Sequence, residues 1–461
     1  MSETTATQST HVFAESRVLL RLALPLMGAQ LAQMGMGVMD AVMAGRYSSI
    51  DLAGVALGGS ILWPVMMLFM GLIQAVTPTV SQLNGAKKQS EIGEVIRQGL
   101  WMAIVGGVVA SIVLNNIAPV YLWMDIDPRA VAISVPYLTM TSLGLPALMC
   151  FFCLRFLADG MGFTRPALYI AVCAFLIKIP LNYALIYGEF GLPELGGVGC
   201  GVAQAIIMWF QLLAMLFVVT RHRFRVTQWA SRFSAPEWQR IKPLLIIGLP
   251  IGATIFAEIG LFSFTTLLLG RYGAEVVAAH NIAMNINGVL FMPALALGMA
   301  GTIRIGFRVG AGEIEQARTS AAILIGMTIG IALVGSILIF LLRSNMVEFY
   351  TSELPVVELA TTLLLFVAFF LVFDATQTAC VGTLRGYKDT KRPMYIALVS
   401  YWVIGLPLGI VLGLGLIGEP MRVYGFWVGL AVGVGTAACL LSIRLWRMSG
   451  NTALIRQYAQ K

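Results

Sequence analysis

The sequence predicts an all-α membrane protein of about twelve transmembrane helices, in two six-helix lobes related by a pseudo-twofold axis along the membrane normal. Three observations predict this fold class. The 461 residues are 58% hydrophobic and only 11% charged, their apolar residues form long runs, and the two halves of the chain resemble each other. A soluble protein carries about 25% charged residues, because it must cover its core with a solvated surface.

The apolar runs have the length that a membrane requires. A helix needs about 20 mostly apolar residues to cross the hydrocarbon core. About twelve runs satisfy this condition, near 18–43, 53–79, 96–118, 131–156, 166–187, 196–220, 242–269, 277–301, 319–342, 355–381, 393–416 and 423–446. Residues 1–17 are polar and lack the pattern of a signal peptide.

The basic residues between the runs predict the orientation. An even number of spans puts both termini on one side, and 24 Lys and Arg residues then lie on that side against five on the other. The remaining one, Lys178, falls inside a run. The positive-inside rule therefore predicts that both termini face the cytoplasm.

Matching residues in the two halves indicate an internal duplication. Pro25 and Thr77 recur as Pro250 and Thr302 at one constant offset, and Pro180 recurs as Pro407 at nearly the same offset. The predicted domains are a cytoplasmic tail (1–17), an N-lobe (18–220), a cytoplasmic loop (221–241), a C-lobe (242–446) and a second tail (447–461).

A duplication of six-span units favours transport. Secondary transporters built from repeats bind their cargo near the bilayer midplane and move one repeat against the other. A duplicated scaffold without a transport role is the alternative that this pattern alone leaves open.

Three acidic residues and one lysine inside the predicted spans stand out as candidate functional charges. They are Asp40, Glu258 and Asp374, with Lys178 as the single cation. A charge at mid-bilayer is costly and indicates function. Burial favours the neutral form of a carboxyl group, so such a group can exchange a proton, ligate sodium or attract a cationic drug. We predict coupling or substrate roles for all three acids.

Helical spacing assigns polar neighbours to these charges. Residues three or four apart share a helix face, and Gln33 and Asp40 lie two turns apart. Candidate supporting residues for coupling or substrate binding are Lys178, Asn182, Gln33, Phe370, Gln377, Ser60, Asn281 and Asn285. Interhelical hydrogen bonding is the structural alternative for Ser60, Asn281 and Asn285.

Four prolines fall within spans. Pro25, Pro180, Pro250 and Pro407 are predicted to interrupt their helices and to free backbone carbonyl groups. Such interruptions mark hinges or cavity linings in transporters, or merely static kinks.

Other functional classes lack their residues. The three histidines, His11, His222 and His280, form no H-E-x-x-H motif, so we expect no enzyme. A P-loop is also absent, which points to an ion gradient rather than ATP as the energy source. The formal charge of +8 is explained by cytoplasmic loops rather than by nucleic acid. Cys150 and Cys153 lie among apolar residues and have no second pair at zinc spacing.

Several motifs resemble those of one transporter family. Ala-Gln-Met-Gly-Met-Gly-Val-Met-Asp40, Asp159-Gly-Met-Gly-Phe-Thr-Arg-Pro, Pro193-Glu-Leu-Gly-Gly-Val-Gly and Leu384-Arg-Gly-Tyr-Lys-Asp-Thr are similar to signatures of NorM-type multidrug and toxic compound extrusion (MATE) transporters. The resemblance runs from the first span to the twelfth. It implies the MATE fold and a multidrug efflux antiporter that exports cationic dyes and fluoroquinolone-like drugs and confers antibiotic resistance.

The resemblance also implies a cation-coupling role for Asp40 in the N-lobe and for Glu258 and Asp374 in the C-lobe. Two positions differ from the sodium-coupled relatives: Phe370 replaces a tyrosine, and Lys178 replaces an asparagine. A lysine ammonium beside Asp40 would occupy the place of a metal ion. We therefore expect proton coupling, with Na⁺ at Glu258 and Asp374 as the alternative.

The expected partners are small organic cations and the lipid bilayer. We expect no cofactor, no firm metal site, no nucleic acid, no ATP and no required oligomer. A lipid-linked sugar flippase of related fold is the alternative function. Its cargo is a polyanion, whereas the buried charges here are mostly acidic.

Overall fold

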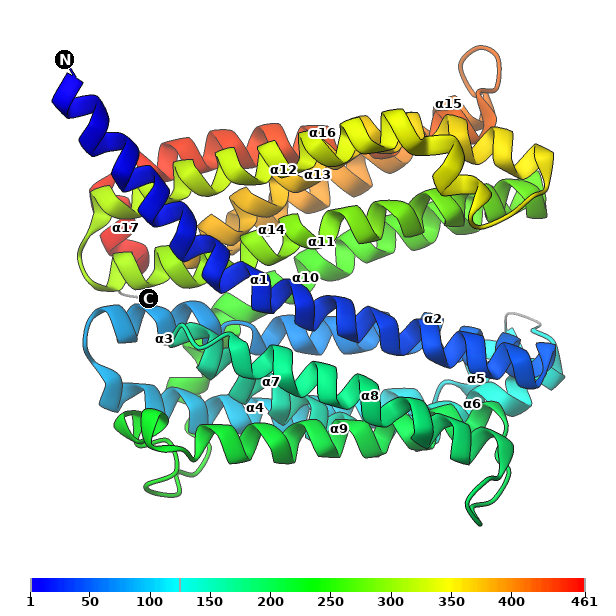
Figure 1. Ribbon diagram of the computed structural model, residues 1–461, viewed down its shortest axis with the longest axis horizontal. Coiled ribbons are helices and arrows are strands. Elements are labelled where there is room, and N and C mark those ends of the chain that lie inside the picture. Colours follow the sequence, from blue (N-terminus) through cyan, green and yellow to red (C-terminus); the bar gives the residue numbers. More distant parts are fainter. Residues whose placement is uncertain (1, 124–125, 460–461) are drawn as a thin grey trace. The chain divides into compact units, whose positions relative to one another are not determined.

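The computed structural model describes residues 2–123 and 126–459, and every regular element within them is a helix (Figure 1). The all-α prediction is confirmed for this part of the chain. Met1 and Lys461, the ends of the two predicted tails, lie outside the described residues.

The helices of the first half follow one another closely. They are α1 (Ser2–Tyr47), α2 (Ser49–Ile73), α3 (Val76–Gly85), α4 (Gln89–Asn115), α5 (Ala118–Trp123), α6 (Pro128–Ser142), α7 (Leu145–Gly160), α8 (Arg165–Tyr187) and α9 (Gly197–Val219), followed by the 3-10 helix η1 (His222–Thr227).

The second half is also built from successive helices. They are α10 (Trp238–Leu269), the 3-10 helix η2 (Gly270–Tyr272), α11 (Ala274–Gly310), α12 (Ile314–Glu348), α13 (Leu354–Gly386), α14 (Lys391–Leu398), the π-helix η3 (Val399–Gly405), α15 (Leu406–Leu414), α16 (Arg422–Ser449) and α17 (Thr452–Ala459).

The number of membrane spans agrees with the sequence. Among the described residues, 11 helices are long and apolar enough to cross a membrane, or up to 12 when α6 and α7 count as one span bent by 49°. The segment from α2 to α3 counts as one such helix, and so does the segment from α14 to α15. The prediction of about twelve spans is thereby confirmed.

The duplication also governs which residues are buried. Ile96 and Ala103 of α4 are buried, and so are their repeat equivalents in α12, Ala321 and Thr328. The two halves therefore share a packing pattern as well as scattered sequence identities.

The chain packs into two compact units. We call Gly28–Gly252 the N-unit, and Met1–Met27 together with Ala253–Lys461 the C-unit. Both boundaries fall inside helices, in α1 and in α10, and they lie at equivalent positions of the repeat. The predicted lobes, by contrast, divide the chain at the loop 221–241. The sequence repeat and the packing units are therefore different divisions of the same chain.

Each unit has its own apolar core. The N-unit core gathers residues of α2, α4, α7 and α9, and the C-unit core gathers residues of α11, α12, α13 and α16. Small residues allow close helix contact, as is usual within lipid. A Cβ on Gly382 of α13 would lie 2.2 Å from the carbonyl oxygen of Gly298 of α11. Nearby, Thr302 Oγ1 donates to the Gly382 carbonyl at 2.8 Å.

The four prolines do not all interrupt their helices. Helices α1, α8 and α10 continue through Pro25, Pro180 and Pro250, whereas Pro407 follows the π-helical segment η3. A proline removes one backbone hydrogen bond. The bonds of the flanking turns are retained because an apolar environment offers them no other partner. The prediction of an interrupted helix thus holds only near Pro407.

Candidate functional site

The N-unit acid, Asp40, is paired with a lysine. Asp40 lies on α1 and is 7% exposed, and Lys178 on α8 is 1% exposed. Lys178 Nζ donates to Asp40 Oδ2 at 2.7 Å, and Asn182 Nδ2, one turn further along α8, donates to Asp40 Oδ1 at 2.7 Å. Both carboxylate oxygens are therefore satisfied, and the charge is balanced.

The lysine has a second partner on a third helix. Lys178 Nζ also donates to Gln204 Oε1 on α9. The ammonium thus joins three helices of the N-unit. Gln204 was not singled out from the sequence, although an amide inside an apolar span is a usable signal.

Gln33 does not belong to this cluster. It lies two turns before Asp40 on α1 and is half-buried. Among the described residues it makes no hydrogen bond to Asp40, Lys178 or Asn182.

The two C-unit acids are linked by one amide. Gln377 Nε2 donates to Glu258 Oε1 of α10 at 3.1 Å and to Asp374 Oδ1 of α13 at 2.9 Å. Asp374 and Gln377 are 3% and 2% exposed, and Glu258 is half-buried. The predicted shared face of Asp374 and Gln377 is therefore the face that meets Glu258.

A tyrosine completes this cluster. Tyr401, 2% exposed, donates from its hydroxyl to Gln377 Oε1 at 2.7 Å. It lies in the π-helical segment η3, whose next residue, Trp402, donates from Nε1 to the Ala257 carbonyl at 3.1 Å. π-Helical turns are rare and frequently occur at functional sites. Neither aromatic residue was predicted from the sequence, because nothing in their spacing distinguishes them from lipid-facing ones.

The charge balance of the C-unit cluster differs from that of Asp40. Two carboxyl groups share one neutral amide, and Arg385, three turns further along α13, is a cation whose charge acts on Glu258. Neighbouring carboxylates in a medium of low dielectric repel each other. A proton or a small cation removes that repulsion, so the cluster can load and release one.

Phe370 forms an apolar wall beside this cluster. It lies one turn before Asp374 on α13, is 1% exposed, and packs edge-to-face on Phe262 with the ring centroids 5.9 Å apart. Its ring offers no oxygen to a sodium ion.

The remaining predicted residues lie apart from the acids. Ser60 and Asn285 are exposed and bond to their own helices: Ser60 Oγ to the Leu57 carbonyl at 2.7 Å, and Asn285 Nδ2 to the Asn281 carbonyl at 2.8 Å. These bonds are intrahelical rather than interhelical. Within the described residues, no three His, Cys, Asp or Glu side chains form a group that could hold a metal ion.

A duplicated bundle of membrane-spanning helices with buried carboxyl groups in both halves is the architecture of a secondary transporter. The profile of the MatE family matches residues 25–184 and 250–411, two segments that begin at repeat-equivalent prolines. The chain therefore belongs to the MatE family.

Close relatives cover nearly the whole chain. Multidrug resistance protein PmpM of Pseudomonas aeruginosa is 43% identical over 448 residues, which are 96% of this chain and 94% of that protein. Multidrug resistance protein MdtK of Yersinia pseudotuberculosis is 40% identical over 449 residues, 96% and 98% of the two chains. Both relatives are named multidrug resistance proteins.

Solved structures share the fold. The eukaryotic MATE transporter AtDTX14 superposes with a TM-score of 0.89 at 21% identity, covering 98% of this chain and 99% of that one. VcmN of Vibrio cholerae, in its bent form, superposes with a TM-score of 0.83 at 17% identity and covers 97% and 99%. The predicted MATE fold is confirmed.

Proposed function

We propose that this protein is a multidrug efflux antiporter that exports organic cations, including dyes and fluoroquinolone-like drugs, in exchange for protons. One observation carries the proposal: the carboxyl groups of half-buried Glu258 and buried Asp374 share a single amide and have no lysine partner among the described residues. The names of the relatives, multidrug resistance proteins PmpM and MdtK, support the same cargo class.

Protons are favoured over sodium by the contrast between the two units. At Asp40, the Lys178 ammonium lies 2.7 Å from the carboxylate and supplies the charge that a sodium ion would bring. In the C-unit, the side chain one turn before Asp374 is Phe370, which has no oxygen to offer a sodium ion. A proton needs only a carboxyl oxygen, whereas sodium needs several oxygen ligands. Sodium at Glu258 and Asp374 is the alternative.

The exchange follows from competition for charge. A cationic drug and a proton both neutralise a buried carboxylate, so binding of one favours release of the other. Exposure of the cluster alternately to the two sides of the membrane, as in repeat-built transporters, then drives export from a proton gradient. We propose a location in the inner membrane with both termini cytoplasmic, from the excess of basic residues on that side.

The proposal is tested with everted membrane vesicles that contain the protein. Ethidium accumulation is measured with an acidified lumen, or with a sodium-loaded lumen at equal pH. Wild-type protein is expected to accumulate ethidium in the first condition and not in the second.

Asp374→Asn is the decisive variant. It is expected to insert normally and to lose gradient-driven accumulation. The matched control is Glu358→Gln, which removes an exposed acid from the same helix. Accumulation driven only by sodium would refute proton coupling, and wild-type rates in Asp374→Asn would refute the site. If the wild-type protein accumulates no ethidium under either gradient, drug efflux is refuted and a lipid-linked sugar flippase is favoured.

A further inference from the structure

Two helices belong to both packing units. The N-unit is Gly28–Gly252, so α1 enters it only after Met27 and α10 leaves it after Gly252. The other described helices each lie within one unit. The first part of α1 thus packs in the C-unit while its second part carries Asp40 in the N-unit. The first part of α10 packs in the N-unit while its second part carries Glu258 in the C-unit.

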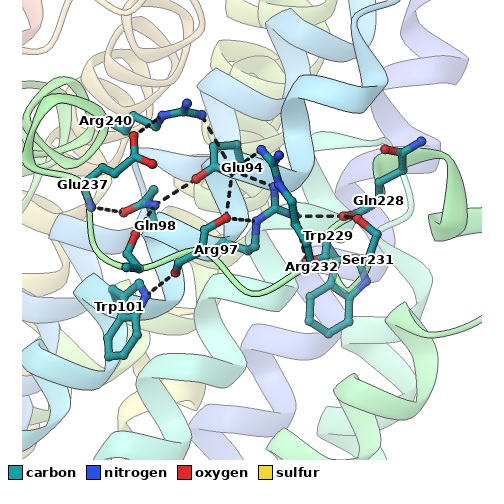
Figure 2. A network of polar contacts seen from close by, with 12 residues as sticks. Glu94, Arg97, Gln98, Trp101, Gln228, Trp229, Ser231, Arg232, Glu237 and Arg240 are labelled. Carbon is teal, nitrogen blue, oxygen red and sulfur yellow. Dashed lines mark hydrogen bonds and ion pairs between the residues drawn. The ribbon is translucent and has the colours of Figure 1, made fainter.

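The first part of α10 is held in the N-unit by a carboxylate. Glu94 of α4, with 11% of its side chain exposed, accepts from Arg97 at 2.6 Å and from Arg232 at 3.1 Å. Arg240, in the first turn of α10, lies 3.7 Å from the same oxygen. Figure 2 shows these arginines converging on Glu94 from three directions.

Neutral side chains of α4 fix the preceding loop beside this carboxylate. Gln98, fully buried, donates to the Ala235 carbonyl at 3.0 Å and accepts from the backbone N–H of Glu237 at 2.9 Å. Trp101 Nε1 donates to the Ser234 carbonyl at 2.9 Å. Glu94, Gln98 and Trp101 lie on one face of α4, so a single helix face binds the segment that leads into α10.

The first part of α1 is held in the C-unit in the same manner. Glu15, 6% exposed, accepts from Arg304 of α11 through two parallel bonds of 2.6 Å. It also accepts from Ser320 of α12 at 2.6 Å and from Arg308 at 3.4 Å. Bidentate pairs of this kind are among the strongest hydrogen bonds of proteins and fix the geometry of both partners.

The two clusters occupy equivalent places in the duplicated chain with their charges exchanged. Glu15 and Arg240 are repeat equivalents, at the same offset as Pro25 and Pro250, and Ser320 adjoins the equivalent of Glu94. In the C-unit the acid comes from the helix that is held, whereas in the N-unit it comes from the helix that holds. A comparison of residue types between the two repeats does not reveal this relation, because Glu15 and its equivalent Arg240 carry opposite charges.

We infer that Glu15 and Glu94 are positioning residues for transport. We call Glu15 with Arg304 and Ser320 the C-unit tether, and Glu94 with Arg232 and Arg240 the N-unit tether. The C-unit tether attaches the first part of α1 to the C-unit, although Asp40 of α1 lies in the N-unit. The N-unit tether attaches the first part of α10 to the N-unit, although Glu258 of α10 lies in the C-unit. The inference rests on the proposed antiport.

The consequence is mechanical. Glu15 precedes Asp40 by about 38 Å of helix, and Arg240 precedes Glu258 by about 27 Å, at about 1.5 Å per residue. Any displacement of one unit against the other must be absorbed within α1 and α10, because these are the helices that both units share. When the first half of α1 or α10 is tethered, the displacement moves the half of the same helix that carries the acid. Loading of the ion at that acid is thereby linked to the conformation of the protein. Without its tether, the first half of α1 or α10 would move independently of its unit, and the ion would be released without transport of the drug.

The test uses cysteine pairs in a chain whose six native cysteines are replaced. Glu94→Cys with Arg240→Cys removes the N-unit tether, and a bifunctional maleimide then restores it covalently. Glu15→Cys with Ser320→Cys does the same for the C-unit tether. A Lys88→Cys with Glu91→Cys pair is the matched control, because that ion pair is exposed beside the start of α4. Turnover and the KM for ethidium are measured in proteoliposomes before and after cross-linking.

Each tether pair is expected to lower turnover at least tenfold with less than a twofold change in KM, and cross-linking is expected to restore at least half of the lost turnover. Wild-type turnover in the uncross-linked pairs would overturn the inference, as would arrest after cross-linking, because a tether never has to open.

If a pair fails to fold, Glu94→Gln, which keeps the shape and one acceptor oxygen, replaces it beside Glu91→Gln. It is expected to lose turnover several-fold, and unchanged turnover would overturn the inference. Hydrogen exchange of residues 238–252 gives a readout that needs no transport, and only Glu94→Gln is expected to accelerate it. A wild-type protein that moves no ethidium refutes the proposed function instead, while exchange still decides the tether.

Discussion

Replacing Lys178 with asparagine should convert the N-unit acid into a sodium-dependent site. In the native chain, Lys178 Nζ lies 2.7 Å from Asp40 Oδ2 and Asn182 binds the other carboxylate oxygen. At this distance and an effective dielectric of about 20, the ammonium contributes about 6 kcal/mol of gross attraction. Lys178→Asn removes it and leaves the carboxylate of Asp40 buried among amides.

Only another cation beside Asp40 can restore the stability that Lys178→Asn loses. Removing one partner of a buried ion pair costs about 3–5 kcal/mol. Sodium that binds only the folded variant, at about 100 times its dissociation constant, returns about 2.7 kcal/mol. The unfolding temperature of Lys178→Asn in detergent should therefore fall by several degrees in choline chloride and recover in large part in sodium chloride. The wild-type protein should show no such difference.

Two controls separate charge from shape. Lys178→Met has a similar volume but no oxygen, so sodium should stabilise it less than Lys178→Asn. The double variant Asp40→Asn with Lys178→Asn has no buried charge, so its response to sodium should vanish. Equal unfolding temperatures of Lys178→Asn in sodium and choline would refute the reasoning that the ammonium takes the place of a metal ion.

Four further outcomes are expected. Tyr401→Phe leaves Gln377 Oε1 without its donor, at a cost of about 1–3 kcal/mol, and should weaken the coupling-ion affinity up to roughly tenfold; an unchanged ion dependence of ethidium transport would contradict this. Phe370→Tyr adds a hydroxyl one turn from Asp374 and should make transport partly responsive to a sodium gradient in vesicles; transport that still ignores sodium would contradict this. Gly312→Ala should destabilise the protein by about 1 kcal/mol, because Gly312 has a φ of +79° and nothing lies within 4 Å of an added methyl group. Its repeat equivalent Lys87 has a φ of 59°, so Lys87→Gly should stabilise by a similar amount; thermal unfolding shifts of the same sign in both variants would contradict the backbone argument.

The spans and the duplication could be predicted because both depend only on which residue types follow one another along the chain. A run of about 20 apolar residues forms a helix wherever lipid surrounds it, since every backbone group must be bonded within the segment. Asp374 and Gln377 could be placed on one face because helical geometry relates residues three apart. The motifs of the spans likewise indicate the family from the sequence alone.

The partners of these residues depend on how helices distant in sequence pack against one another. Nothing in the order of residues states that Lys178 reaches Asp40, or that Gln377 bonds to Glu258, because these pairs are 138 and 119 residues apart. Tyr401 joins the C-unit cluster through a π-helical turn that no periodicity predicts.

The sequence by itself determined an all-α membrane protein with two repeats, its family and the three acids within its spans, because membrane insertion and helix formation depend on local composition. The tertiary structure alone decided that one acid is neutralised and that two share an amide. It also decided that α1 and α10 each belong in part to both packing units. The first part of α1 is held through its acid Glu15, whereas the first part of α10 is held through its basic residue Arg240. These features depend on which helices come into contact, and contact between distant segments is set by the packing of the whole chain.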